Sequence, residues 1–150
     1  MRKVILIGDS IRMAYQPVVA EILENEAEVW GPDENGGDSA NVLAFLGAWA
    51  LGREADVIHF NCGLHDLRLC PGDEGYQVPI DAYRRNIQKI VDVLAAETPA
   101  ELVWATITPV DDEWHADAPD DFSRTQADVE RYNRAALEVV NRASLRVNDL

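Results

Sequence analysis

Basic side chains, cysteines and long apolar runs are all scarce in this 150-residue chain. Only 13 lysine and arginine residues face 27 aspartate and glutamate residues, which gives a formal net charge of -14. This balance argues against a nucleic-acid partner and against anionic membranes, because both bind basic surfaces. No apolar run approaches the length needed to cross a bilayer. We therefore expect a protein that binds neither nucleic acid nor membrane.

The amino terminus resembles a secretion signal, because Met1, Arg2 and Lys3 precede a short apolar run. Asp9 ends that run too early for a signal peptide, so the sequence predicts a cytoplasmic protein. The two cysteines, Cys62 and Cys70, form no C-x-x-C pair and no cluster with zinc spacing. We expect two free thiols, as is usual in a reducing cytosol, and no metal site.

The chain does contain a regular alternation of strand-like and helix-like segments. Apolar runs predict strands at residues 3–7, 27–30, 56–60, 101–107 and 145–148. Helical spacing of apolar residues predicts helices over residues 11–24, 39–51, 79–97 and 123–142. Stretches rich in glycine, proline and acidic residues connect them at 31–38, 61–78 and 108–121. Strands joined by helical crossovers predict one α/β domain of three layers around a mostly parallel sheet.

Aromatic and histidine side chains outside the loops are predicted to pack in the interior. Trp30, Trp49 and Trp104 fit core or helix-packing positions, and His59 fits a position packed within the sheet. Trp114 lies among acidic residues, so we expect it to be exposed and to border a pocket.

The most informative segment is Gly8-Asp9-Ser10, which ends the first strand and opens the first helix. In a parallel sheet the loops after the strands meet at one edge, where such folds bind ligands. A serine placed there can act as a nucleophile, because the helix directs its positive end and free N–H groups at the site. The alternative is structural, since both Asp9 and Ser10 suit a helix N-cap.

Two further loops bring polar residues to the same edge. Residues 35–39 (Asn-Gly-Gly-Asp-Ser) follow the second strand, and paired glycines let the backbone approach a ligand. Residues 61–66 (Asn-Cys-Gly-Leu-His-Asp) follow the third strand. Taken separately, each loop also fits a simple role, as a tight turn and as a hydrogen-bonded loop in which Asp66 caps a turn.

In order and placement these three segments resemble the sequence blocks of the SGNH hydrolase superfamily, also called GDSL esterases and lipases. The resemblance implies a flavodoxin-like, five-stranded parallel sheet and an ester substrate, without metal or organic cofactor. It implies that Ser10 attacks the acyl carbon to form an acyl-enzyme. The oxyanion is then held by the N–H groups of Ser10 and Gly37, with His65 or Asn61 adding a side-chain donor.

Two features depart from the family's pattern. His65 stands where the family usually has an asparagine, although an imidazole N–H can also donate. The family takes its general base from an Asp-x-x-His block after the fifth strand, and no residue of 1–150 matches that position. A literal match at residues 112–115 follows the fourth strand, and we interpret it as an exposed acidic loop. We therefore expect a C-terminally truncated domain over 1–150, weak or inactive by itself.

Asp9, Arg12 and Asp66 are candidate substrate-binding residues, because they flank the predicted nucleophile and donors. For Arg12 the alternative is a surface position in the first turn of the helix, and Arg68 has the same ambiguity.

The family also closes its sheet with a further helix, so an open apolar face predicts a homodimer. A glycan- or acyl-binding module is the alternative function. A nucleotide-binding domain is disfavoured, because glycine-rich phosphate-binding patterns are missing.

Overall fold

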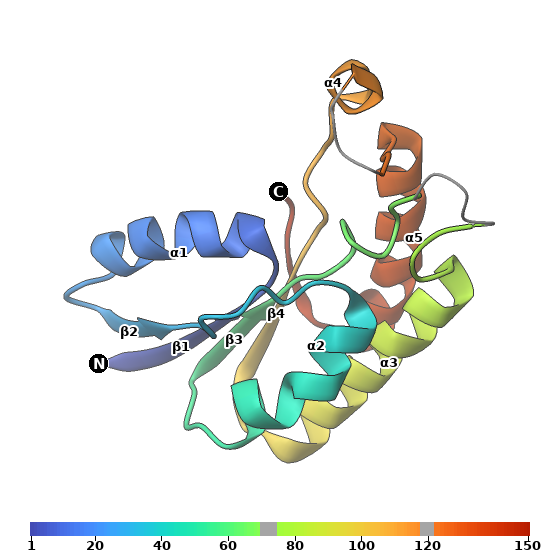
Figure 1. Ribbon diagram of the computed structural model, residues 1–150. Coiled ribbons are helices and arrows are strands. Elements are labelled where there is room, and N and C mark those ends of the chain that lie inside the picture. Colours follow the sequence, from blue (N-terminus) through green and yellow to red (C-terminus); the bar gives the residue numbers. More distant parts are fainter. Residues whose placement is uncertain (70–74, 118–121) are drawn as a thin grey trace.

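Five parallel strands form one sheet in the computed structural model, which describes residues 1–69, 75–117 and 122–150 (Figure 1). The strand order is β2-β1-β3-β4-β5, and every neighbouring pair is parallel. The predicted α/β fold is thereby confirmed. The strand bounds are β1 (Arg2–Ile7), β2 (Ala27–Trp30), β3 (Val57–Phe60), β4 (Glu101–Ala105) and β5 (Arg146–Asn148).

Helices cover both faces of this sheet (Figure 1). On one face lies α1 (Ser10–Ile22), and on the other lie α2 (Ser39–Leu46), α3 (Ile80–Glu97) and α5 (Gln126–Arg142). The short helix α4 (Asp112–Asp117) stands away from the sheet, beyond the carboxyl end of β4. This arrangement leaves the loops after β1, β2, β3 and β4 at a single edge of the sheet, as parallel topology requires.

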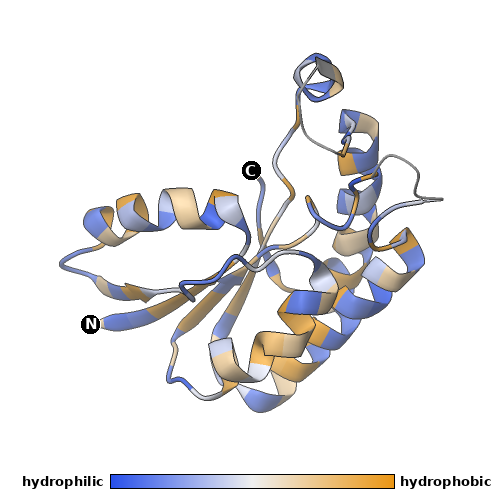
Figure 2. Ribbon diagram, viewed as in Figure 1, coloured by the Kyte–Doolittle hydropathy of each residue, from blue (hydrophilic) through white to orange (hydrophobic). Residues whose placement is uncertain are grey.

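The core fills the space between the sheet and the helices α2, α3 and α5, where apolar side chains concentrate (Figure 2). Trp104 and Phe60 are fully buried there and meet edge to face, with ring centroids 5.3 Å apart. Trp49 is also buried, whereas Trp30 is half-buried beneath the guanidinium of Arg53, 3.5 Å from its ring. The predicted interior positions of Trp49 and Trp104 are confirmed.

His59 is half-buried within the sheet, which confirms its predicted place there. Asn148 Nδ2 lies 3.2 Å from His59 Nε2, and the hydroxyl of Tyr15 lies 3.5 Å from Nδ1. Burial lowers the pKa of His59.

Cys62 is a buried free thiol, as predicted, while Cys70 lies outside the described residues. No described helix is long and apolar enough to cross a membrane.

The predicted strands and the first helix end within two residues of the observed ones, and three other predicted segments differ more. The second helix does not continue regularly to residue 51, because Gly47–Leu51 forms the π-helical turn η1, closed by a bond from Gly52 N to Gly47 O. The fourth long helix begins at Gln126 rather than at 123, because the Thr125 side chain caps it by accepting a hydrogen bond from Asp128 N. Residues 112–117 are helical rather than part of an irregular loop, because Asp111 Oδ1 accepts a hydrogen bond from Trp114 N.

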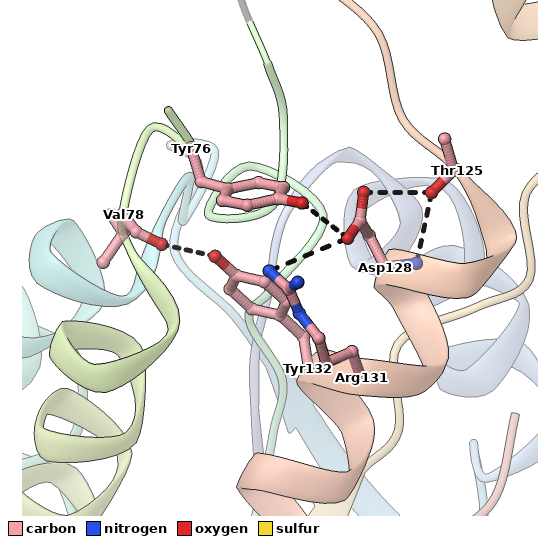
Figure 3. Close-up of polar contacts among 6 residues, drawn as sticks. All are labelled: Tyr76, Val78, Thr125, Asp128, Arg131 and Tyr132. Carbon is pink, nitrogen blue, oxygen red and sulfur yellow. Dashed lines mark hydrogen bonds and ion pairs between the residues drawn. The ribbon is translucent and has the colours of Figure 1, made fainter. Parts of the chain in front are cut away.

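The long loop after β3 is attached to α5 (Figure 3). The hydroxyl of Tyr76 donates to Asp128 Oδ1 at 2.7 Å, and Asp128 Oδ2 accepts from Thr125 Oγ1 at 2.9 Å. Nearby, the hydroxyl of Tyr132 donates to the carbonyl of Val78 at 2.8 Å. These contacts anchor the end of the loop that also carries the candidate residues His65 and Asp66.

Candidate active site

Ser10 occupies the first position of α1 with its side chain exposed at the carboxyl edge of the sheet. The helix cap is Asp9, whose Oδ1 accepts a hydrogen bond from Ile11 N at 2.9 Å. The N-cap role, which fits both Asp9 and Ser10 in the sequence, is thus performed by Asp9 alone. The Ser10 hydroxyl is left beside the positive end of a helix, which is where a developing anion is stabilised.

Ser10 lines a cleft of about 260 Å³ between the start of α1, the loop after β3 and the segment carrying α4. Apolar walls come from Ile11, Leu64, Pro109 and Val110. Polar and aromatic side chains complete the lining: Asp9, His65, Thr108, Asp111, Trp114, His115 and Arg124. A few convergent polar groups in a concave, partly apolar space are typical of a small-molecule site.

His65 is the candidate side-chain donor that reaches this cleft. Its imidazole is half-buried, and burial lowers its pKa, so the ring is neutral near pH 7. A neutral imidazole carries one N–H donor and one acceptor nitrogen. Asn61, the other candidate, uses its Nδ2 group on the carbonyls of Ala105 and Thr106, at 2.7 and 3.0 Å. Asn61 therefore joins the ends of β3 and β4, and its amide protons are already engaged.

The paired glycines after β2 pack directly against the Ser10 turn. Gly36 N donates to Gly8 O at 2.9 Å, and a Cβ on Gly36 would lie 2.6 Å from that same oxygen. Gly37 has a φ of +63°, which favours glycine at this position. Its N–H donates to Asn35 Oδ1 at 2.9 Å. The Gly37 amide is thus near the turn that holds Ser10, and Asn35 must release it before it can bind an oxyanion.

The three candidate substrate-binding residues are all buried: Asp9 is 2% exposed, Arg12 3% and Asp66 0%. Asp9 lines the cleft, whereas Arg12 and Asp66 do not. Arg12 donates to Gln16 Oε1 at 2.7 Å and to Glu34 O at 2.8 Å, so its guanidinium joins α1 to the loop after β2. Burial lowers its pKa. The alternative of a surface arginine is wrong, because this turn of α1 packs against that loop.

Asp66 belongs to a buried cluster that the sequence pattern did not predict. Its two carboxylate oxygens each lie 3.0 Å from Ser39 N, and Oδ1 also accepts from the Ser39 hydroxyl. Asn86 Nδ2 donates to Ser39 Oγ at 3.0 Å. In the sequence, the polar pair Asp38-Ser39 at the start of a predicted helix fits a helix N-cap, and nothing in it points to a contact with Asp66.

Trp114 and His115 form the wall of the cleft contributed by α4. Trp114 is 62% exposed, as predicted, and its ring meets that of His115 edge to face at 5.0 Å. Within the described residues, His115 Nδ1 is buried without a hydrogen-bond partner. The Asp-x-x-His sequence at 112–115, interpreted as an exposed loop, therefore supplies cleft residues. Arg68 lies instead on the loop after β3, where its Nε donates to Gln77 Oε1.

Solved structures share this fold over nearly the whole chain. An acetyl xylan esterase, AlAXEase, superposes with a TM-score of 0.79 at 19% identity, covering 99% of this chain and 77% of that one. A GDSL-like lipase from Bacteroides thetaiotaomicron gives 0.75 at 13%, covering 99% and 68%. The psychrotrophic esterase EstA from Pseudoalteromonas gives 0.71 at 12%, covering 100% and 78%.

Compared by sequence, the chain matches no protein-family model and no curated protein. The structural likeness nevertheless extends over the entire sheet and its helices. The protein has the fold of the GDSL/SGNH esterases and lipases, which confirms the resemblance found in its sequence.

Proposed function

We propose that this protein hydrolyses carboxylic esters, with Ser10 as the nucleophile. The observation that carries the proposal is the exposed Ser10 side chain, which lines a 260 Å³ cleft together with His65. Asp9 caps α1, so the Ser10 hydroxyl is not needed for the helix. The fold shared with esterases supports the same chemistry.

In the proposed reaction Ser10 Oγ bonds to the acyl carbon, and its proton passes to a general base. The tetrahedral oxyanion accepts hydrogen bonds from the N–H groups of Ser10 and Gly37 and from His65. Each such donor is worth about 3 kcal/mol in the transition state. Collapse breaks the bond to the alcohol oxygen, which takes the proton from the base. Water then attacks the acyl-enzyme, releasing the carboxylic acid and restoring the Ser10 hydroxyl.

The general base is assigned to no described residue. His65 is the proposed oxyanion donor, and His115 belongs to the α4 wall of the cleft. Free imidazole added to the assay can take the Ser10 proton in place of a protein base. Imidazole-dependent hydrolysis by residues 1–150 therefore reports on the Ser10 hydroxyl itself.

The test is hydrolysis of p-nitrophenyl acetate, with and without imidazole, and detection of acetylated protein by intact mass. An acetyl group suits a small cleft, and one similar structure is an acetyl xylan esterase. Ser10→Ala is expected to abolish the imidazole-dependent turnover by the protein and the acetylation at residue 10, since the nucleophile and the base act as a unit. Ser144→Ala is the matched control, since Ser144 is an exposed serine lining a different groove, beside the start of β5.

Equal turnover by Ser10→Ala and the parent protein would show that Ser10 is not the nucleophile. Tight binding of an acylated glycan without turnover or acetylation would instead favour the non-catalytic glycan- or acyl-binding module.

A further inference from the structure

The two loops that carry the proposed oxyanion donors are joined by one buried contact. Gly37 lies two residues before Ser39, and His65 lies directly before Asp66. Asp66 accepts hydrogen bonds from both the backbone N–H and the hydroxyl of Ser39, and both side chains are fully buried. A displacement of Asp66 relative to Ser39 would therefore change the separation of the two donors.

The contact is also held from a third element. Asn86 on α3 donates to Ser39 Oγ at 3.0 Å. With its oxygen accepting from Asn86, the Ser39 hydroxyl directs its own proton to Asp66. When Asp66 is ionised, each hydrogen bond in this chain of contacts has a defined direction, because a carboxylate only accepts and Ser39 supplies both donors. On the other side of Asp66, its carbonyl accepts from Val78 N at 3.0 Å, which holds the loop in register.

A carboxylate in this position is costly for the fold. Burial raises the pKa of Asp66 to about 7, and the nearby carboxylate of Asp38 acts in the same direction, while the hydrogen bonds from Ser39 oppose the rise. Buried polar groups of this kind are often neutral or harmful to stability compared with apolar residues. The presence of Asp66 at this costly position, next to the proposed oxyanion donors, is consistent with a role in placing those donors.

We propose that Asp66 and Ser39 form a positioning pair that sets the separation of the Gly37 amide and the His65 imidazole. This inference rests on the proposed ester hydrolysis, because only that reaction gives the two donors a common oxyanion. Neither Asp66 nor Ser39 lines the cleft, so the pair acts through its neighbours rather than on the substrate.

The kinetic test compares Asp66→Asn and Ser39→Ala with the parent protein. Asp66→Asn keeps the size of the side chain but presents an amide donor to the Ser39 donors, and Ser39→Ala removes only the hydroxyl. Displaced donors bind the transition state less well than before and leave substrate binding unchanged. We expect kcat to fall roughly tenfold to a hundredfold with KM within about twofold. Asp128→Asn, which removes another hydrogen-bonded carboxylate away from the cleft, should leave both constants unchanged.

A second measurement does not depend on activity. In NMR spectra of folded protein, Asp66→Asn or Ser39→Ala should shift the Gly37 amide and His65 ring resonances, and Asp128→Asn should not. Unmoved resonances, or an unchanged kcat in a folded variant, would overturn the positioning role. Failure of the proposed function has a different signature, since parent and Ser10→Ala would then be equally inactive while the shifts are still observed.

Discussion

The two edges of the sheet treat polar side chains in opposite ways. At the carboxyl edge the described chain buries five charged, serine or threonine side chains, each 3% exposed or less: Asp9, Arg12, Ser39, Asp66 and Thr106. At the amino edge the charged residues remain in water. Lys3 pairs there with Glu54 at 2.7 Å, and Arg146 pairs with Glu101 at 3.2 Å, with exposed side chains.

This difference shows where the fold accepts an energetic cost. A buried polar group costs free energy unless its hydrogen bonds are remade, whereas an exposed ion pair costs and gains little. The costly groups gather around the cleft and hold its loops together, as Arg12 does between α1 and the loop after β2. Local departures from the stablest choice of residue are expected at functional sites. If the two edges differ in this way, substitutions at the carboxyl edge should change stability more than substitutions at the amino edge.

The largest expected effect is a pH dependence of stability caused by Asp66. Its folded pKa is raised from 3.8 to about 7 by burial, so the folded state binds a proton more tightly than the unfolded state. The resulting stabilisation is complete below pH 4 and is lost as the pH rises through 7. Relative to Asp66→Asn, the parent protein should lose about 2.5 kcal/mol of unfolding free energy between pH 5 and pH 8.

Urea unfolding of both proteins at the two pH values measures this difference. Burial lowers the pKa of His59 and of His65, but both histidines are present in both proteins and cancel in the comparison. Parallel stability curves for parent and variant would mean that Asp66 is charged in the folded state at pH 5, as a solvated carboxylate would be.

A second comparison uses two glycines, one near each edge. A Cβ on Gly36 would meet backbone atoms of Gly8 at 2.6 and 3.0 Å, so Gly36→Ala should destabilise the fold by about 2 kcal/mol. Gly47 begins η1 with φ -58° and has nothing within 4 Å of its Cβ position. Gly47→Ala should instead stabilise by about 0.5 kcal/mol. Thermal unfolding of the two variants gives the signs, and the same sign for both would contradict this account of packing.

The strands can be predicted from the sequence, whereas the buried side-chain contacts cannot. Residues 27–30 were predicted as a strand with the same bounds as β2, because an apolar run between turn signals is a local property. The Asp66–Ser39 contact joins residues 27 apart and leaves no periodic signal. Helix α4 was missed because its acidic sequence lacks an apolar face. Its start depends on the Asp111 cap and on Gln126 N, which donates to Asp112 Oδ1 at 2.6 Å.

For the site, the sequence pattern predicted which loops lie together, but not which hydrogen-bond donors remain free to bind a ligand. Ser10 and His65 line one cleft, whereas Asn61 is engaged with Ala105 and Thr106 and the Gly37 amide with Asn35. Whether a donor is already engaged depends on the directions of neighbouring side chains, and the spacing of residues in the sequence does not specify these directions. The catalytic roles, the cytoplasmic location and the homodimer stay predictions.

Tyr76→Phe tests the loop anchor seen in Figure 3 and should have a smaller effect. The variant loses the 2.7 Å hydrogen bond to Asp128 but keeps the aromatic ring beside Tyr132, at a centroid distance of 5.7 Å. A hydrogen bond to a charged group at a partly exposed position contributes about 1 kcal/mol. Urea unfolding should show that loss, with esterase activity unchanged. A fall in kcat would mean that the anchor also positions His65.

The smallest effect is expected at the amino edge, where Lys3→Gln removes the ion pair with Glu54. Both side chains are exposed, at 47% and 89%, so solvent and salt screen their attraction. The hydrogen bond and charge of Glu54 raise the pKa of Lys3, but a shift at a fully solvated group carries little stability. The melting temperature should stay the same at low and high salt. A loss as large as that of Tyr76→Phe would show that polar contacts at this edge also hold the fold together, and the contrast between the edges would then fail.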